Sequence, residues 1–121
     1  MIGEFARASV LGFAVAAAAV GSAAARSAYD GSWSLIFYTQ RGACEATYHF
    51  GVQISNGIVT HPNLVKFRGR VSPNRAVRAS VSVPGKYASG SGRLTRTAGR
   101  GRWAGRSGRD RCSGYWTAQR Y

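Results

Sequence analysis

The chain has 121 residues, and its 17 Lys and Arg outnumber its 4 Asp and Glu, giving a formal net charge of +13. This length accommodates one small domain. With so few carboxylates, two histidines and two cysteines, the chain has little from which to build a catalytic or metal centre, whereas its charge favours an anionic partner.

Residues 1–25 differ in composition from the rest of the chain. A nearly unbroken apolar run over residues 10–20 leads into small residues, with Ala23 and Ala25 in the A-x-A positions of a cleavage site. We therefore predict a signal peptide over residues 1–25, cleaved after Ala25, followed by a single basic β domain over residues 26–121. The alternative is a membrane anchor, which would need about 20 apolar residues, more than this run provides.

Export has two consequences for the predicted domain. The signal peptide contains one basic residue, Arg7, and one acidic residue, Glu4, so the product keeps its charge of +13 in the periplasm or outside the cell. The product also passes through an oxidising compartment, where Cys44 and Cys112 can form only one disulfide. Closing a loop of this length would stabilise the fold by about 4 kcal/mol. Neither cysteine has the C-x-x-C or Cys/His spacing of a metal site.

After residue 25, apolar and polar residues alternate with a period of two, which predicts strands rather than helices. The first predicted strand covers residues 33–39 and the second covers residues 48–55. Asn-Gly at residues 56–57 is typical of a type I′ hairpin turn, which places Ile54 opposite Val59.

Two further strands are predicted over residues 64–71 and 77–83, separated by a Ser-Pro-Asn turn. In both strands the apolar residues share one face, so the basic residues share the other. Pairing the inward residues of neighbouring strands places Arg70 opposite Arg78. The same procedure applied further along the chain places Arg93 opposite Arg102.

The last third of the chain repeats a short pattern of a small residue, then Gly, then a large apolar residue, over residues 90–94, 99–103 and 112–116. Glycine on the inner face lets a sheet curve tightly and leaves room for a neighbour's ring. We therefore predict an all-β fold, a small antiparallel meander barrel of about seven or eight strands. The alternatives are a two-sheet β-sandwich and a disordered basic tail from residue 87 onward.

Four segments carry a resemblance: Tyr-Asp-Gly-Ser-Trp-Ser at residues 29–34, Gly-Arg-Val-Ser-Pro-Asn at residues 69–74, Ala-Ser-Gly-Ser-Gly-Arg-Leu at residues 88–94 and Cys-Ser-Gly-Tyr-Trp-Thr-Ala at residues 112–118. Over residues 29–120 the chain resembles small exported proteins common in soil α-proteobacteria. Those proteins are rich in Gly, Trp and Arg, and have a signal peptide, one cysteine pair and Gly-Trp strands. The resemblance implies export and a β domain. The group has no assigned function, so the resemblance implies no active site.

The reactive groups of the chain predict no catalytic residues, no metal site and no cofactor. Glu45 and His49 lie four residues apart on an extended strand, on the order of 13 Å, which is too far for a nucleophile and its base. By the predicted register His49 points outwards and His61 inwards, so the two do not converge on a metal ion. We interpret each as a structural or loop histidine.

From residue 66 to residue 111 there are 13 basic residues and a single acid, Asp110. Like charges opposite each other on neighbouring strands are unfavourable, so local stability does not account for the inferred arginine pairs. Two interpretations remain: solvated arginines that keep the protein soluble, or a sheet face that binds a polyanion through guanidinium donors. The predicted polyanion contacts are Lys66, Arg68, Arg70, Arg78, Arg93, Arg100 and Arg102.

The leading hypothesis is a non-enzymatic periplasmic or secreted module that binds anionic polymers of the envelope or the extracellular matrix. Its partners would be anionic polysaccharide, lipopolysaccharide, phospholipid surfaces or extracellular DNA, and not intracellular nucleic acid. The alternative is a small barrel that holds an apolar ligand or blocks another protein's site, with Trp33, Trp103 and Trp116 lining its interior. A structural envelope component and an enzyme are the remaining hypotheses. The sequence specifies no oligomeric state.

Overall fold

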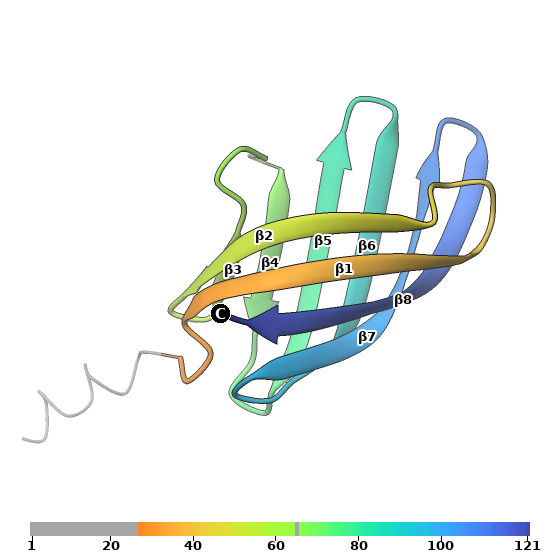
Figure 1. Ribbon diagram of the computed structural model, residues 1–121. Coiled ribbons are helices and arrows are strands. Elements are labelled where there is room, and N and C mark those ends of the chain that lie inside the picture. Colours follow the sequence, from red (N-terminus) through yellow and green to blue (C-terminus); the bar gives the residue numbers. More distant parts are fainter. Residues whose placement is uncertain (1–26, 65) are drawn as a thin grey trace, which may run out of the picture.

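The structure, a computed structural model, describes residues 27–64 and 66–121 (Figure 1). The predicted signal peptide over residues 1–25 lies outside the described residues. Eight antiparallel strands, each paired with its neighbour in the sequence, form a closed barrel in which β8 pairs with β1. This confirms the predicted meander barrel. The strands are β1 (Gly31–Arg41), β2 (Thr47–Ser55), β3 (Ile58–Thr60), β4 (Phe67–Val71), β5 (Ala76–Val83), β6 (Lys86–Leu94), β7 (Ala98–Ser107) and β8 (Asp110–Arg120).

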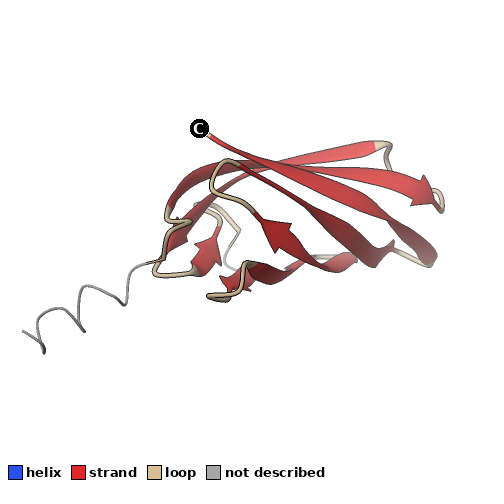
Figure 2. Cartoon of the chain, turned by 90° about the horizontal axis from the view of Figure 1, so that it is seen from below, coloured by secondary structure: helices blue, strands red, loops and turns tan. Residues whose placement is uncertain are grey.

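The strands on opposite sides of the barrel run in different directions. In Figure 1, β1, β2 and β8 run across the front and cross β4, β5 and β6, which lie behind them, at a steep angle. Such crossing follows from the tilt that strands must adopt for a sheet to close on itself. Figure 2 shows that strands and short loops account for all of the described chain.

Alternate side chains point inwards and occupy most of the barrel interior. Trp33 is fully buried, with 1% of its surface exposed, and Trp103 and Trp116 are buried as well. Each of these last two indoles donates a hydrogen bond to a backbone carbonyl, Trp103 to Tyr38 and Trp116 to Ser91. Buried indole N–H groups are thereby satisfied. The other buried apolar residues are Tyr29, Phe37, Val52, Ile54, Val59, Phe67, Val71, Val77, Leu94, Cys112 and Ala118.

Glycine makes room for the ring of Trp116. Gly92 lies opposite Gly101, and Gly101 lies opposite Trp116, so the indole packs over two residues without side chains. A Cβ on Gly101 would come within 2.6 Å of Trp116 Cε2, and a Cβ on Gly92 would come within 2.6 Å of Trp116 Cζ2. These glycines are therefore required by close approach, as the repeated Gly and aromatic pattern predicted.

Residues 27–30 cover the end of the barrel at which β1 begins. The Asp30 carboxylate accepts hydrogen bonds from the backbone N–H groups of Asn56 and Gly57. These two residues have φ angles of 53° and 79°. Positive φ at both central positions is what a type I′ turn requires, so the predicted hairpin is confirmed. Its tip is held to the start of β1 by the carboxylate.

Arg120 completes this end of the barrel. It lies opposite Trp33 on the inward face of β8, with its guanidinium carbon 5.7 Å from the centre of the Trp33 ring. Its guanidinium donates hydrogen bonds to the carbonyls of Ala28, Arg96 and Asp30. The side chain therefore joins the N-terminal segment, the β6–β7 turn and the core.

The disulfide lies at the other end of the barrel. Cys44, in the loop between β1 and β2, is bonded to Cys112 of β8, with 6.1 Å between their Cα atoms, as predicted. Gly42 of the same loop has a φ of 96°, and a Cβ there would overlap the Arg111 carbonyl and lie 2.7 Å from Cys112 Sγ. The loop therefore packs directly against β8.

The predicted start of the strand over residues 64–71 is wrong. The strand begins at Phe67 rather than at residue 64. The Phe67 N–H donates to the Leu64 carbonyl, and His61 Nδ1 accepts a hydrogen bond from the Leu64 N–H. The chain therefore turns after β3, because its backbone groups bond locally instead of to a neighbouring strand.

The predicted register between β6 and β7 is also wrong by two residues. Arg93 lies opposite Arg100, not opposite Arg102, which faces Ser91. The turn is tighter than inferred, with the Thr95 N–H bonded to the Ala98 carbonyl, so pairing begins earlier along the chain. A two-residue shift preserves which face each side chain occupies. The other inferred pairs, Arg70 with Arg78 and Ile54 with Val59, are confirmed.

Candidate functional site

Outward-facing side chains of β4 to β8 form rows that run across the strands, because residues directly opposite each other share a face. Three successive rows matter here. The arginine row consists of Arg70, Arg78, Ser91, Arg102 and Tyr115. The floor row consists of Arg68, Ser80, Ser89, Ala104 and Ser113. The edge row consists of Ser82, Tyr87, Arg106 and Arg111.

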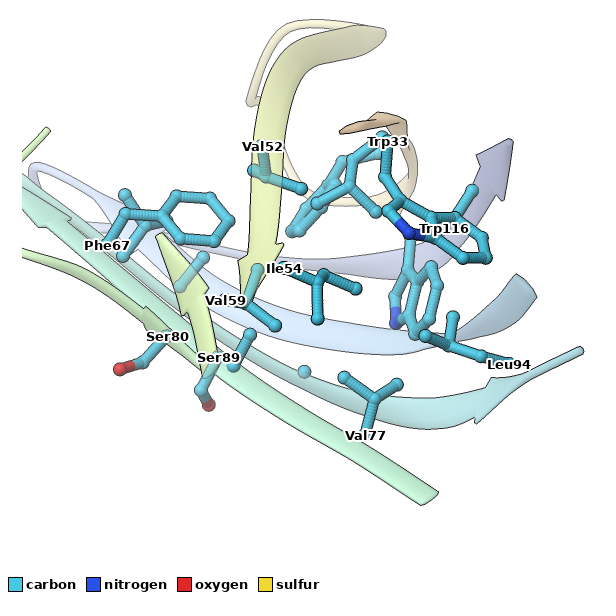
Figure 3. A pocket seen from close by; sticks show the side chains of 17 residues that line it. Trp33, Val52, Ile54, Val59, Phe67, Val77, Ser80, Ser89, Leu94 and Trp116 are labelled. Carbon is cyan, nitrogen blue, oxygen red and sulfur yellow. The ribbon is translucent and has the colours of Figure 1, made fainter. Parts of the chain in front are cut away.

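The floor row contains mostly small side chains and lies between two rows with long ones, which produces a groove on the outer surface. One hollow is lined by Arg68, Arg70, Arg78 and Arg102 together with Ser80, Ser89, Ser91, Ala104 and Ser113. A second hollow shares Ser89, Ala104 and Ser113 with the first and adds Arg41, Tyr87, Arg106 and Arg111. We call the two together the arginine groove. Figure 3 shows the hydroxyls of Ser80 and Ser89 pointing away from the barrel interior.

Arginines face each other directly at three places on this side of the barrel: Arg70 with Arg78, Arg93 with Arg100, and Arg106 with Arg111. All six are exposed. Like charges placed opposite each other on a ladder repel. The outer surface of β4 to β8 is therefore strongly cationic.

The acidic residues of the described chain lie outside the three rows. Asp30 caps the hairpin turn at the N-terminal end of the barrel. Glu45 belongs to the loop that carries Cys44, and Asp110 lies opposite Ser107 where β7 and β8 meet. None of the three is therefore placed among the arginines of the groove floor and walls, and the field over the groove is positive.

The structure distributes the seven predicted polyanion contacts over three locations. Arg68, Arg70, Arg78 and Arg102 line the arginine groove. Arg93 and Arg100 form a pair on the same outer face, one row nearer the β6–β7 turn. Lys66 is exposed and precedes β4, outside the groove.

Sequence reasoning missed three arginines that line the groove, namely Arg41, Arg106 and Arg111. Arg106 has the same strand parity as Arg102, so alternation along β7 could have identified it. Arg111 follows the β7–β8 turn, and its position opposite Arg106 depends on the register of that hairpin. The floor of serine and alanine was also missed, because its members come from four different strands.

Two tyrosines stand at one end of the arginine row. Tyr115 lies opposite Arg102 on one side and opposite Tyr38 on the other. The two tyrosine rings are stacked, with 4.6 Å between centroids and 13° between planes. Each ring therefore covers one face of the other, next to Arg102.

Described residues of the barrel interior line two apolar cavities that could bear on function. The first, of about 40 Å³, is surrounded by Trp33, Trp116 and aliphatic side chains that point into it (Figure 3). Ligand pockets usually measure about 300 to 1,000 Å³, so this space is too small for an organic ligand. The second, of about 230 Å³, lies at the disulfide end and is lined by Trp103, Phe37 and Phe50, among others.

Neither histidine belongs to a reactive cluster. His61 Nδ1 accepts backbone hydrogen bonds from Asn63 and Leu64, and the ring stacks against Phe67 at 6.0 Å between centroids. His49 is exposed on the outer face of β2. Over residues 27–64 and 66–121, no three His, Cys, Asp or Glu side chains lie close enough together to hold a metal ion.

Comparison with known proteins finds no match: no family model, no curated protein and no solved structure is significantly similar to this chain. Within the described part of the chain, no helix is long and apolar enough to span a membrane.

Proposed function

We propose that this protein is an exported, non-enzymatic module that binds anionic polymers of the cell envelope or the extracellular matrix. The observation that supports it most is the set of three directly opposed arginine pairs on one outer face. Each pair costs some stability in the isolated protein, and an anionic partner removes that cost. A polyanion bound between the arginines therefore accounts for a pattern that folding alone disfavours.

The chemistry of the groove supports the same proposal. Guanidinium groups present donors in a fixed fork that matches carboxylate, sulfate and phosphate oxygens. The groove brings such groups together from β1, β4, β5, β7 and β8. The disulfide is compatible with an oxidising location, where the polyanions within reach are acidic polysaccharide, lipopolysaccharide, phospholipid surfaces and extracellular DNA.

The test compares two double variants that have the same net charge, one that loses arginines of the groove and one that loses arginines outside it. The double variant Arg78→Ser/Arg102→Ser loses two arginines that line the groove. The control Arg96→Ser/Arg109→Ser loses two exposed arginines from turns at the ends of the barrel. Heparin affinity is measured from about 50 to 200 mM salt. The logarithm of the binding constant falls linearly with the logarithm of the salt concentration, and each lost contact makes this dependence shallower by about 1.

We expect the salt dependence of heparin binding to become shallower by about two in the groove variant and to change little in the control. Equal losses in both variants would show that net charge alone governs binding. Heparin affinity of the wild-type protein that does not fall with salt would contradict the proposal, because counterion release requires that fall.

A second candidate function, the binding of an apolar ligand smaller than those of ordinary ligand pockets, is supported by the 230 Å³ cavity at the disulfide end. Its apolar lining includes Trp103, so a small apolar ligand bound there would change tryptophan fluorescence. Binding of this kind would be nearly independent of salt. A titration with a short-chain fatty alcohol, in wild type and in Val81→Phe, which fills the cavity, separates this function from polyanion binding.

A further inference from the structure

We infer that the arginine groove binds a single chain of an acidic polysaccharide, lying across strands β4 to β8 with its acidic groups between the arginine row and the edge row. This inference rests on the proposed function and names the ligand class. Three observations lead to it: the width of the groove, the chemistry of its floor and its course across the strands.

The width admits one polymer chain. The arginine row and the edge row are four residues apart along each strand, because the floor row lies two residues from each of them. At the rise of an extended strand this is on the order of 13 Å between backbones, and the arginine side chains narrow it further. A planar lipid surface and a nucleic acid duplex are wider than this space and would rest on the walls. A single glycan chain would enter.

The floor suits a hydroxylated chain. Ser80, Ser89 and Ser113 present hydroxyls, which both donate and accept hydrogen bonds, and Ala104 leaves space between them. Single-stranded nucleic acids are usually held by aromatic rings on which successive bases stack. The floor row contains no aromatic residue, and the faces of Tyr38 and Tyr115 are partly used in stacking on each other. Tyr87 of the edge row is exposed and lines the groove, but a single ring does not form a platform for successive bases. The groove therefore favours sugar rings over bases.

The groove also has the course that a linear chain needs. It extends from Arg68 on β4 to Arg111 on β8, crossing four gaps between strands. At the usual strand spacing this is on the order of 19 Å, enough for a few sugar units. One side of the groove has arginines on β4, β5 and β7, namely Arg70, Arg78 and Arg102, and the other side has arginines on β7 and β8, namely Arg106 and Arg111.

The experiment fills the floor without changing the charge. Ala104→Gln places a longer neutral side chain on the floor, and Ser89→Gln does the same from the opposing strand. Ala98→Gln is the matched control: the same substitution at an exposed position of the same strand face, six residues away and outside the groove. The probes are an oligogalacturonate, single-stranded DNA, duplex DNA and phosphatidylglycerol vesicles.

We expect the oligogalacturonate affinity to fall about tenfold in Ala104→Gln and in Ser89→Gln, and to stay unchanged in Ala98→Gln. Affinity for duplex DNA and for vesicles should stay unchanged in all three, because those ligands do not reach the floor. Thermal unfolding of each variant verifies the fold.

The other outcomes overturn the inference in distinguishable ways. Oligogalacturonate binding could be weakened by Arg78→Ser/Arg102→Ser but by neither floor variant. In that case the ligand does not enter the groove, and only the proposed function stands. If the floor variants weaken single-stranded DNA more than the glycan, the occupant is a nucleotide chain. If wild-type protein binds none of the four probes, both the inference and the proposed function fail.

Discussion

The inward and outward surfaces of β6 and β7 differ sharply although both are formed by the same two strands. Inwards, the two strands present one glycine pair, Gly92 with Gly101, further glycines and Trp103, packed so tightly that an added methyl group meets a ring or a carbonyl. Outwards, they present Arg93 opposite Arg100 and Ser91 opposite Arg102, all exposed. One surface specifies the fold through close contact, and the other carries charge that the fold does not need.

This separation is a direct result of strand geometry. Successive side chains alternate between faces, so a strand can meet packing requirements at every second residue and leave the others free. Substitutions inwards should therefore change stability, and substitutions outwards should change ligand affinity.

The largest effect is expected from the disulfide, whose Cys112 lies on the inward surface of β8 and is 4% exposed. Cys44→Ser/Cys112→Ser should lower the free energy of unfolding by about 4 kcal/mol, because the 68-residue separation is no longer constrained in the unfolded chain. Urea denaturation of wild type and variant measures it. A loss below 1 kcal/mol would show that packing alone holds the β1–β2 loop on β8.

The next effect compares two adjacent residues of β7. Gly101→Ala should destabilise by about 3 kcal/mol, because the new methyl group overlaps the Ser91 carbonyl and the Trp116 ring. Arg102→Ala, one residue further and on the opposite face, should leave stability nearly unchanged and weaken heparin binding. Chemical denaturation and heparin affinity are measured on both variants. A variant that changed stability and affinity to the same extent would contradict the division between the two faces.

Arg120 tests whether the residue type or the face matters, because it is an arginine on the inward surface. Arg120→Met keeps much of the packing over Trp33 and removes the hydrogen bonds to the carbonyls of Ala28, Asp30 and Arg96. We expect a loss of about 2 kcal/mol in thermal or urea unfolding, with heparin affinity retained. Arg100→Met, on the outward face, is the control. It should retain the stability of the wild type and lower the affinity for heparin.

The smallest effect concerns the opposed pair itself. Arg93→Ser/Arg100→Ser should raise the free energy of unfolding by about 0.5 kcal/mol at low salt, because repulsion across the ladder is removed. The gain should disappear at high salt, where the charges are screened. Arg96→Ser/Arg109→Ser should give no comparable gain, and equal gains in both would assign the effect to net charge.

Much of the fold could be predicted because its determinants are local. The Asn56-Gly57 turn places two residues with positive φ between strands in which apolar and polar residues alternate. The glycines near Trp116 indicate a curved sheet. The β6–β7 register could not be predicted from residues alone. A turn that closes at Ala98 rather than further along shifts every pair by two without changing which face is apolar, so the pattern does not distinguish the two registers.

The candidate site divides in the same way. That the arginines of β4 to β7 share the outward face was determined by the sequence itself, since parity is a property of each strand's backbone, and so was the pairing of the only two cysteines. The groove was decided by the tertiary structure. Its floor takes Ser80, Ser89, Ala104 and Ser113 from four strands, and only the hydrogen bonds between those strands place them in one row between the arginines.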